Sequence, residues 1–281
     1  MNKKVSKIKK LFSRNSYSLN EEKIPKNRII IENWEGTVNI GDQLPKVICE
    51  YMLNREHLTA DQPVSKSVHL LTVGSVIGIG LFDAVIWGSG IHLINTAFAA
   101  RKQKKIRNLD IRAVRGPVTK EILRVIGYDC SKVAMGDPAI LMPLIYQPEH
   151  IEKKYKFSVV EHFKKKQSAE SVSCHKISVK TKDYRNFIDE LAASELVISS
   201  SLHGIILAEA YGVPAIFVNP DHLMDHQLMK YYDWYYSTGR DNVVIAHSVE
   251  EALTMTPMPL PHLEELQESL IRAFPYDLWK K

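Results

Sequence analysis

The sequence predicts an α/β protein built from two lobes, each around a parallel sheet, with a ligand cleft between them. Short apolar runs typical of buried strands alternate with helical patterns along most of the 281 residues, and this alternation is typical of parallel sheets. A charged, aperiodic segment at 144–156, which contains Pro148, interrupts the alternation. We therefore expect an N-terminal lobe at 28–145 and a C-terminal lobe at 146–262.

In the N-terminal lobe, an apolar run predicts a first strand at 28–31, and a helix follows at 41–53. Pro117 suits the first turn of a helix and Gly127 suits its end, so we expect a helix over 117–126. The remaining strands of this lobe are expected near 68–73, 84–87 and 111–114.

Two apolar stretches, 70–82 and 84–100, have the length of a membrane segment when taken together. They are broken by Asp83 and by five glycines, and a membrane-spanning helix needs about 20 uninterrupted apolar residues. We interpret both stretches as buried strands joined by glycine turns.

The C-terminal lobe continues the same pattern. A helix is expected at 183–193, with Phe187, Ile188 and Leu191 on one face. A second helix, at 205–211, is followed by a glycine, and a final amphipathic helix begins at 263. The strands of this lobe are expected at 157–160, 177–179, 196–198 and 215–218.

The composition, with 45% hydrophobic and 25% charged residues, is typical of a globular protein in water. Three widely spaced cysteines, Cys49, Cys130 and Cys174, have no metal-binding spacing and fit buried thiols in a reducing compartment. No apolar core of a secretory signal follows the first basic residues. We expect a cytoplasmic protein that binds no metal.

The net charge of +5 is concentrated in clusters, the first of which lies in the segment 1–27. Residues 1–14 carry six basic side chains, with apolar residues at helical spacing. This pattern fits a basic helix that rests on anionic lipid, as a peripheral contact with the membrane. A mobile basic tail explains it equally well. Because no nucleic-acid-binding module accompanies the charge, we expect no nucleic-acid partner.

The segment Ser199–Gly204, with the sequence Ser-Ser-Ser-Leu-His-Gly, is the most informative motif. It lies between a predicted buried strand and a predicted helix, and in an open α/β sheet such a turn faces the ligand crevice. The start of a helix offers unpaired N–H groups and a positive dipole end, which suit a phosphate or a carboxylate. His203 adds a proton donor that works near neutral pH.

This motif resembles the C-terminal signature of the polysaccharide pyruvyl transferases. Further blocks that resemble the same family occur in order over about residues 28–279: Asn39–Leu44, Trp87–Gly90, Arg115–Thr119, Gly136–Ala139, Lys230–Ser237 and Phe274–Trp279. The resemblance implies two Rossmann-like lobes, similar to the B-type glycosyltransferase fold. In such folds the last helix, here within 263–281, often packs back on the N-terminal lobe.

The resemblance also implies a reaction. Pyruvate moves from phosphoenolpyruvate to a hexose of a surface-polysaccharide precursor, where it forms a cyclic ketal, and phosphate is released. The donor is a substrate, so no cofactor is expected. The acceptor is expected to be a lipid-linked oligosaccharide, which would suit the basic N-terminus. Two alternatives stay open: a nucleotide-sugar-dependent glycosyltransferase of the same architecture, and a non-catalytic scaffold that binds sugars or anions.

Three residues are the catalytic candidates. His203 is the first choice for general acid, and its alternative is a capping or buried structural role. Arg115 follows a predicted strand and precedes a helix, so its guanidinium is expected to bind the donor; a salt bridge that fixes the loop is the alternative. His162, in the sequence Glu161-His162-Phe163, follows another strand and is a candidate second acid or base.

A common form of the family motif has arginine where this chain has Ser201, so the cation for phosphate or carboxylate must come from elsewhere. Arg115 is the leading replacement, and Lys230 is the second candidate, with a surface lysine beside core aromatics as its alternative. The motif itself supplies further donor contacts, with simple helix capping by the serines as the alternative: Ser199, Ser200, Ser201 and Gly204.

The N-terminal lobe supplies the other binding candidates. Asp42 is expected either to accept a proton from the acceptor hydroxyl or to cap the helix that starts at Gln43. Gly136-Asp137-Pro138 is a candidate lining of the cleft, as Gly88–Gly90 is, with a turn role for Asp137, which precedes a proline, as the favoured interpretation. The tyrosines and tryptophan at 231–236 are assigned mainly to the core, with one or two near a substrate. The remaining candidates line two strand-to-helix turns: Asn39, Gly41, Gly88, Ser89 and Gly90.

Overall fold

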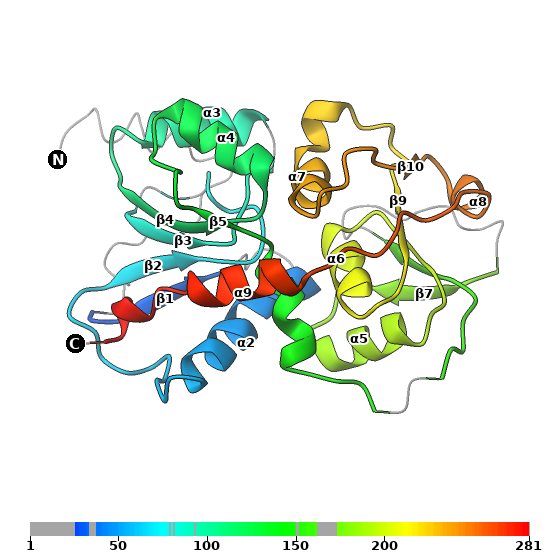
Figure 1. Ribbon diagram of the computed structural model, residues 1–281, viewed down its shortest axis with the longest axis horizontal. Helices are drawn as coiled ribbons and strands as arrows, with labels where there is room; N and C mark the ends of the chain where they lie inside the picture. Colours follow the sequence, from blue (N-terminus) through cyan, green and yellow to red (C-terminus); the bar gives the residue numbers. More distant parts are fainter. Residues whose placement is uncertain are drawn as a thin grey trace.

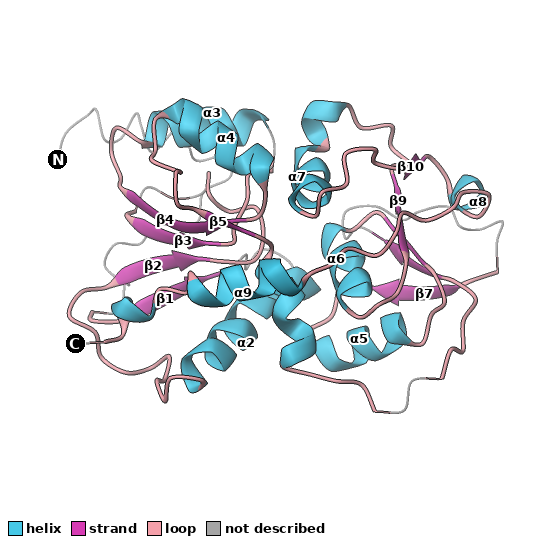
Figure 2. Cartoon of the chain, viewed as in Figure 1, coloured by secondary structure: helices cyan, strands magenta, loops and turns pink. Residues whose placement is uncertain are grey.

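The computed structural model describes residues 26–33, 38–78, 80, 82–92, 94–149, 152–161 and 173–280. It contains two five-stranded, wholly parallel sheets that lie beside one another (Figures 1 and 2). The prediction of two parallel sheets is therefore confirmed. His162 and the basic segment 1–25 lie outside the described residues.

The first sheet has its strands in sequence order, β1-β2-β3-β4-β5. Helices α3 (Ile94–Gln103) and α4 (Pro117–Ile126) cover one face, and α2 (Ile40–Asn54) covers the other (Figure 1). Gly127, in the left-handed conformation at φ 98°, ends α4 where the sequence predicts. The strands are β1 (Ile29–Glu32), β2 (Val68–Leu71), β3 (Ala84–Trp87), β4 (Leu109–Val114) and β5 (Ala134–Met135).

The second sheet has the order β10-β9-β8-β6-β7. Alternate strand residues enter different cores: Val160 packs with the helices α5 (Tyr184–Ala192) and α6 (Leu202–Ala210), whereas Val159 packs on the opposite face with α8 (Val249–Ala252). Burial on both faces explains the continuous apolar runs. The strands are β6 (Ser158–Glu161), β7 (His175–Ser178), β8 (Val197–Ser199), β9 (Ala215–Val218) and β10 (Ile245–Ala246).

The elements between the sheets join the two halves. The 3₁₀ helix η2 (Pro138–Leu144) follows β5 and packs against α6, and one continuous core includes side chains of α2, η2 and α6. Helix α9 (Glu264–Arg272) lies against the first sheet, where the indole Nε1 of Trp87 donates to the carbonyl of Leu270 at 2.9 Å. The remaining elements are η3 (Asp225–Gln227), α7 (Met229–Ser237) and η4 (Tyr276–Leu278).

Two expectations about local structure are wrong. The stretch 84–100 is not all strand, because α3 begins at Ile94; its alanines and long polar residues are good helix formers. Phe98, 54% exposed, shows that this helix is not buried all round. Helix α6 begins at Leu202, three residues before the predicted start, so His203 lies inside its first turn. Among the described residues, no helix has the length and apolarity to span a membrane.

Candidate active site

The turn between β8 and α6 is shaped by one hydroxyl. Ser199 Oγ accepts from the backbone N–H of Ser201 at 3.0 Å and donates to the carbonyl of Ser201 at 2.9 Å. A Cβ on Gly204 would lie 2.5 Å from this oxygen, so only glycine lets α6 approach β8 so closely. Ser199 and Gly204 therefore build the turn. The expectation that the hydroxyl of Ser199 contacts the donor is wrong, because that hydroxyl is fully buried and bonded within the turn.

Ser201 occupies the N-cap position of α6, but its hydroxyl makes no capping bond in the described structure. The alternative of side-chain capping is therefore wrong for this serine. The first-turn N–H groups of α6 point out of the helix toward its N-terminus, as in any α-helix. The carbonyl of neighbouring Ser200 accepts a hydrogen bond from the hydroxyl of Tyr231 at 2.7 Å, which ties α7 to the turn.

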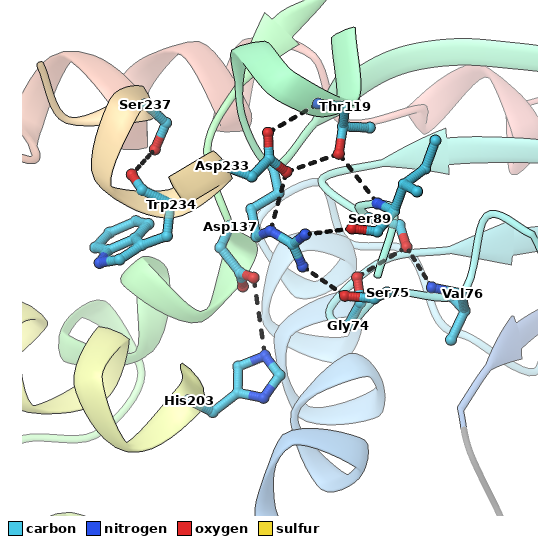
Figure 3. Close-up of polar contacts among 12 residues, drawn as sticks. Gly74, Ser75, Val76, Ser89, Thr119, Asp137, His203, Asp233, Trp234 and Ser237 are labelled. Carbon is cyan, nitrogen blue, oxygen red and sulfur yellow. Dashed lines mark hydrogen bonds and ion pairs between the residues drawn. The ribbon is translucent and has the colours of Figure 1, made fainter. Parts of the chain in front are cut away.

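His203 lies where the two halves of the molecule meet. Its imidazole packs on Gly41, in the first turn of α2, so closely that a Cβ there would lie 2.2 Å from Nδ1. On the other side, Nε2 lies 3.8 Å from Oδ2 of Asp137 (Figure 3). The side chain keeps 14% of its surface exposed. The structure thus brings together Gly41 and His203, which are 162 residues apart in the sequence (203 − 41).

Sequence reasoning favoured a turn role for Asp137, and the structure places this residue beside His203. It is fully buried at the N-cap of η2, just beyond the carboxyl end of β5, where Oδ1 accepts from the backbone N–H of Ala139 at 3.0 Å. Oδ2 has no hydrogen-bond partner among the described residues, and the same is true of His203 Nε2. A turn role accounts for Oδ1, which caps η2, but gives no partner to Oδ2. The sequence signal that pointed to Asp137 was its place in the block Gly136–Ala139, which resembles a block of the pyruvyl transferases.

Arg115 does not line an open site, which corrects its assignment as a donor-binding residue. Its guanidinium is fully buried and donates to Asp233 Oδ2 at 3.1 Å, to Ser75 Oγ at 2.7 Å and to the carbonyl of Ile91 at 3.1 Å. The alternative interpretation, a salt bridge that fixes the loop, is the one the structure bears out. Each of the three guanidinium nitrogens has a partner and the side chain has no exposed surface, so a phosphate in solution cannot reach it.

The partner of Arg115 comes from α7, on the C-terminal side of the molecule. Besides the guanidinium, Asp233 accepts from the backbone N–H of Thr119 at 2.9 Å and from its hydroxyl at 2.7 Å (Figure 3). Burial raises the pKa of the Asp233 carboxyl, and the Arg115 charge and the Thr119 hydrogen bonds act in the opposite direction. Gly116 is required here, because a Cβ would lie 1.9 Å from the carbonyl oxygen of Asp233.

The turn Gly88–Gly90 supports this network and is not a ligand loop. Ser89 Oγ donates to the carbonyl of Gly74 at 3.0 Å and accepts from the N–H of Val76 at 3.3 Å (Figure 3). A Cβ on Gly90 would lie 2.3 Å from the Arg115 guanidinium, and one on Gly88 would collide with the ring of Pro138. The expectation that these residues bind substrate is therefore wrong. The hydroxyl of Ser89 is bonded within the protein, and Arg115 and Pro138 occupy the space beside the two glycines.

At the start of α2, the cap is Asn39. Its Oδ1 accepts from the backbone N–H of Gly41 at 3.0 Å, so the helix begins at Ile40. The predicted cap from Asp42 is wrong because Asp42 lies in the first helical turn. The N–H of Ile40 donates to the carbonyl of Val179 at 2.8 Å, which holds this turn against the loop after β7.

The aromatic segment forms α7 and is mainly core, as expected. Tyr231 stacks on Phe217 with ring centroids 3.9 Å apart, and burial raises its pKa. Trp234 is fully buried, and its Nε1 donates to Glu209 on α6 at 2.9 Å. The ammonium of Lys230 lies 4.8 Å from the centroid of the Tyr231 ring, whose hydroxyl reaches the β8–α6 turn. Tyr236 is exposed.

Comparison with known families supports the resemblance to the pyruvyl transferases. A family model described as polysaccharide pyruvyl transferase matches residues 76–222, which are more than half of the chain. The chain belongs to the polysaccharide pyruvyl transferase family. The matched span of this pyruvyl transferase family member contains both His203 and Asp137, together with the buried Arg115.

Two curated relatives are similar to this chain over more than half of its length. The uncharacterized protein L143 of Acanthamoeba polyphaga mimivirus is 26% identical over 219 residues, which cover 74% of each chain. The succinoglycan biosynthesis protein ExoV of Rhizobium meliloti (strain 1021) is 27% identical over 182 residues, which cover 62% of this chain and 49% of ExoV. The chain thus aligns with about half the length of ExoV.

Among solved structures the similarities are distant. The uncharacterized protein KP1_0663 of Klebsiella pneumoniae has a TM-score of 0.46 at 14% identity, covering 87% of this chain and 99% of that one. The wall teichoic acid polymerase TagF, in its H548A form, has a TM-score of 0.41 at 12% identity, covering 96% of this chain and 87% of TagF.

Proposed function

We propose that this protein transfers pyruvate from phosphoenolpyruvate to two hydroxyls of one hexose in a surface-polysaccharide precursor. Membership of the family and the similarity to a succinoglycan biosynthesis protein support a pyruvyl transferase that acts on a polysaccharide. The observation that carries the proposal is the position of His203. Its side chain is 14% exposed at the start of α6 and lies between Gly41 and Asp137.

The reaction needs a proton at C3 of the enol and loses two protons from the sugar. In our proposal His203 protonates C3, which becomes the methyl carbon, and the first sugar oxygen bonds to C2. The bond between C2 and the phosphate oxygen then breaks, and the second sugar oxygen adds to the oxocarbenium-like centre. One hydroxyl proton replaces the proton that His203 gave to C3, and the other leaves with phosphate. A positioned general acid typically contributes about 10²–10⁴-fold to such a rate.

The donor's carboxylate and phosphate need fixed positive partners. We place one of these anions at the N-terminus of α6, where first-turn N–H groups and the helix dipole attract negative charge. Ser200 and Ser201 belong to this turn, and Lys230 stays the cationic candidate because its ammonium lies over Tyr231, which is bonded to Ser200. With Arg115 inside a buried ion pair, Lys230 replaces it as the first choice.

The acceptor side stays a proposal that rests on the arrangement of α2. Asn39, Gly41 and Asp42 lie beside the His203 ring or within one helical turn of it, so a sugar hydroxyl placed there would be near the acid. We propose a lipid-linked oligosaccharide as the acceptor, with the basic N-terminus as a peripheral contact to anionic lipid at the cytoplasmic face of the membrane. The transfer involves no net oxidation or reduction, so the proposal includes no redox cofactor.

The test is release of phosphate from phosphoenolpyruvate with a panel of β-galactosides and other hexosides. We expect release that depends on the acceptor, a product whose mass fits a pyruvate ketal, and a loss of kcat of about 10²–10⁴-fold in His203→Ala. His247→Ala is the matched control, because this exposed histidine lies after β10 and outside the proposed site. Phosphate release by His203→Ala at the wild-type rate would contradict the role of His203.

A different pattern would favour the alternatives. Absence of release with every acceptor, together with a rise in melting temperature caused by a nucleoside diphosphate and not by phosphoenolpyruvate, would favour a glycosyltransferase. Binding of sugar or phosphoenolpyruvate without turnover by wild type or variant would favour a scaffold.

A further inference from the structure

One oxygen of Asp137 and one nitrogen of His203 face each other without a hydrogen-bond partner among the described residues. These atoms, Asp137 Oδ2 and His203 Nε2, are both buried and lie 3.8 Å apart. A bridging water would need a separation of about 4.5 Å, because two hydrogen bonds of about 2.8 Å meet at the water at a roughly tetrahedral angle. Catalytic hydrogen bonds are often long in unliganded proteins and shorten when substrate binds. The two atoms are therefore placed to bond to each other.

Both partners are fixed from their far sides, so the contact is built into the fold. The second oxygen of Asp137 caps η2 through the N–H of Ala139, and the preceding residue, Gly136, donates its N–H to the carbonyl of Val114 at 2.9 Å. The His203 ring lies against the backbone of Gly41, where there is no room for a side chain. Neither group can turn away without disturbing an element of the core.

We propose that Asp137 is a positioning residue that accepts the Nε2 proton of His203 and thereby makes Nδ1 the nitrogen that exchanges a proton with substrate. This inference rests on the proposed role of His203 as general acid. The two imidazole nitrogens are distinct, and the hydrogen bond made by one decides which proton the other carries. With Nε2–H held by the carboxylate, neutral His203 has a lone pair on Nδ1, and protonated His203 has a transferable proton there.

The surroundings of Asp137 and of His203 Nδ1 agree with these separate roles for the two imidazole nitrogens. Asp137 is fully buried and so does not reach substrate, which leaves it a role only through His203. Nδ1 is on the side of the ring that faces the start of α2 and not Asp137, so it is the nitrogen left to exchange a proton with substrate. In the described part of the chain, His203 is the cationic side chain paired with Asp137.

The proposal is tested with Asp137→Asn, which keeps the size of the side chain and an oxygen that caps η2. An amide can present its NH₂ to Nε2 and favour the wrong tautomer. We expect kcat to fall by about 10²-fold or more, with the KM for phosphoenolpyruvate changed by less than about threefold, because the interaction acts in the transition state. Asp183→Asn is the matched control: Asp183 caps α5 in the same way, and it should leave kcat within about twofold of wild type.

A second readout is independent of activity. In ¹⁵N-histidine-labelled full-length protein, with His203 assigned by loss of its signals in His203→Gln, the neutral ring should carry its proton on Nε2. In Asp137→Asn the Nδ1–H form should gain population. A wild-type ring protonated on Nδ1, or a wild-type kcat in Asp137→Asn, would overturn the proposal. If wild type transfers no pyruvate, the proposed function fails while the tautomer still decides whether Asp137 positions the ring.

Discussion

Two buried carboxylates join the two halves of this molecule, and they are satisfied very differently. Asp233 on α7 receives three hydrogen bonds from the N-terminal lobe, two from Thr119 and one from Arg115 at 3.1 Å. Asp137 beyond β5 uses one oxygen for a helix cap and leaves the other 3.8 Å from His203. Figure 3 shows both acids with their partners: Asp233 with Thr119, and Asp137 with His203.

The comparison teaches how to separate a structural from a functional buried charge. A buried ion pair with every donor and acceptor bonded is fixed, and removal of one partner leaves an uncompensated charge. A buried acid whose second oxygen faces an equally unbonded histidine is instead incomplete, and such unsatisfied groups are rare in native proteins. The first pair holds the halves together, and the second is available for chemistry.

The largest expected effect on stability comes from Asp233→Ala, which leaves the Arg115 guanidinium buried without its counter-charge. We expect the free energy of unfolding to fall by about 3–5 kcal/mol, measured by urea denaturation. The control is Asp277→Ala. Asp277 also pairs with an arginine, Arg112, at 2.9 Å, but it is 60% exposed, and its loss should cost less than about 1 kcal/mol. Equal losses of stability in the two variants would show that the buried Asp233–Arg115 pair contributes no more to stability than the exposed Asp277–Arg112 pair.

The contact of Gly41 with His203 can be tested by adding one methyl group. Gly41→Ala places a Cβ 2.2 Å from Nδ1, so we expect a loss of about 1–3 kcal/mol of stability, as in other overpacked cores. The same change should also reduce kcat by displacing the ring. In the His203→Ala background the space is open, and the stability cost of Gly41→Ala should disappear in a double-mutant cycle. A cost that persists in that background would place the strain elsewhere.

The smallest effect sharpens the description of the Arg115 network. Thr119→Val removes a hydroxyl that donates to Asp233 and accepts from the N–H of Ile91 at 3.0 Å. We expect a loss of about 1–2 kcal/mol, because the buried N–H of Ile91 is left without its partner. Thr254→Val, at an exposed hydroxyl that donates to the carbonyl of Glu251, should change stability by less than about 0.5 kcal/mol. A neutral Thr119→Val would show that the network tolerates an unpaired group.

Local signals determined much of the fold and the location of the site. Pro117 and Gly127 predicted the limits of α4, and apolar runs predicted β3 and β9, because capping preferences and burial act on neighbouring residues. The sequence also indicated that His203 follows a strand at the start of a helix. It was less accurate about where α6 begins, since helix ends depend on how the first turn packs.

The chemical roles of individual side chains were decided by the tertiary structure. Arg115 follows a strand as predicted, yet its partner Asp233 lies 118 residues further along the chain, and no local pattern reveals that pairing. The meeting of Gly41, Asp137 and His203 likewise combines elements of both sheets. Burial and hydrogen bonding are properties of the folded neighbourhood, so only the packing of the two halves shows that every guanidinium nitrogen of Arg115 has a partner whereas Asp137 Oδ2 has none among the described residues.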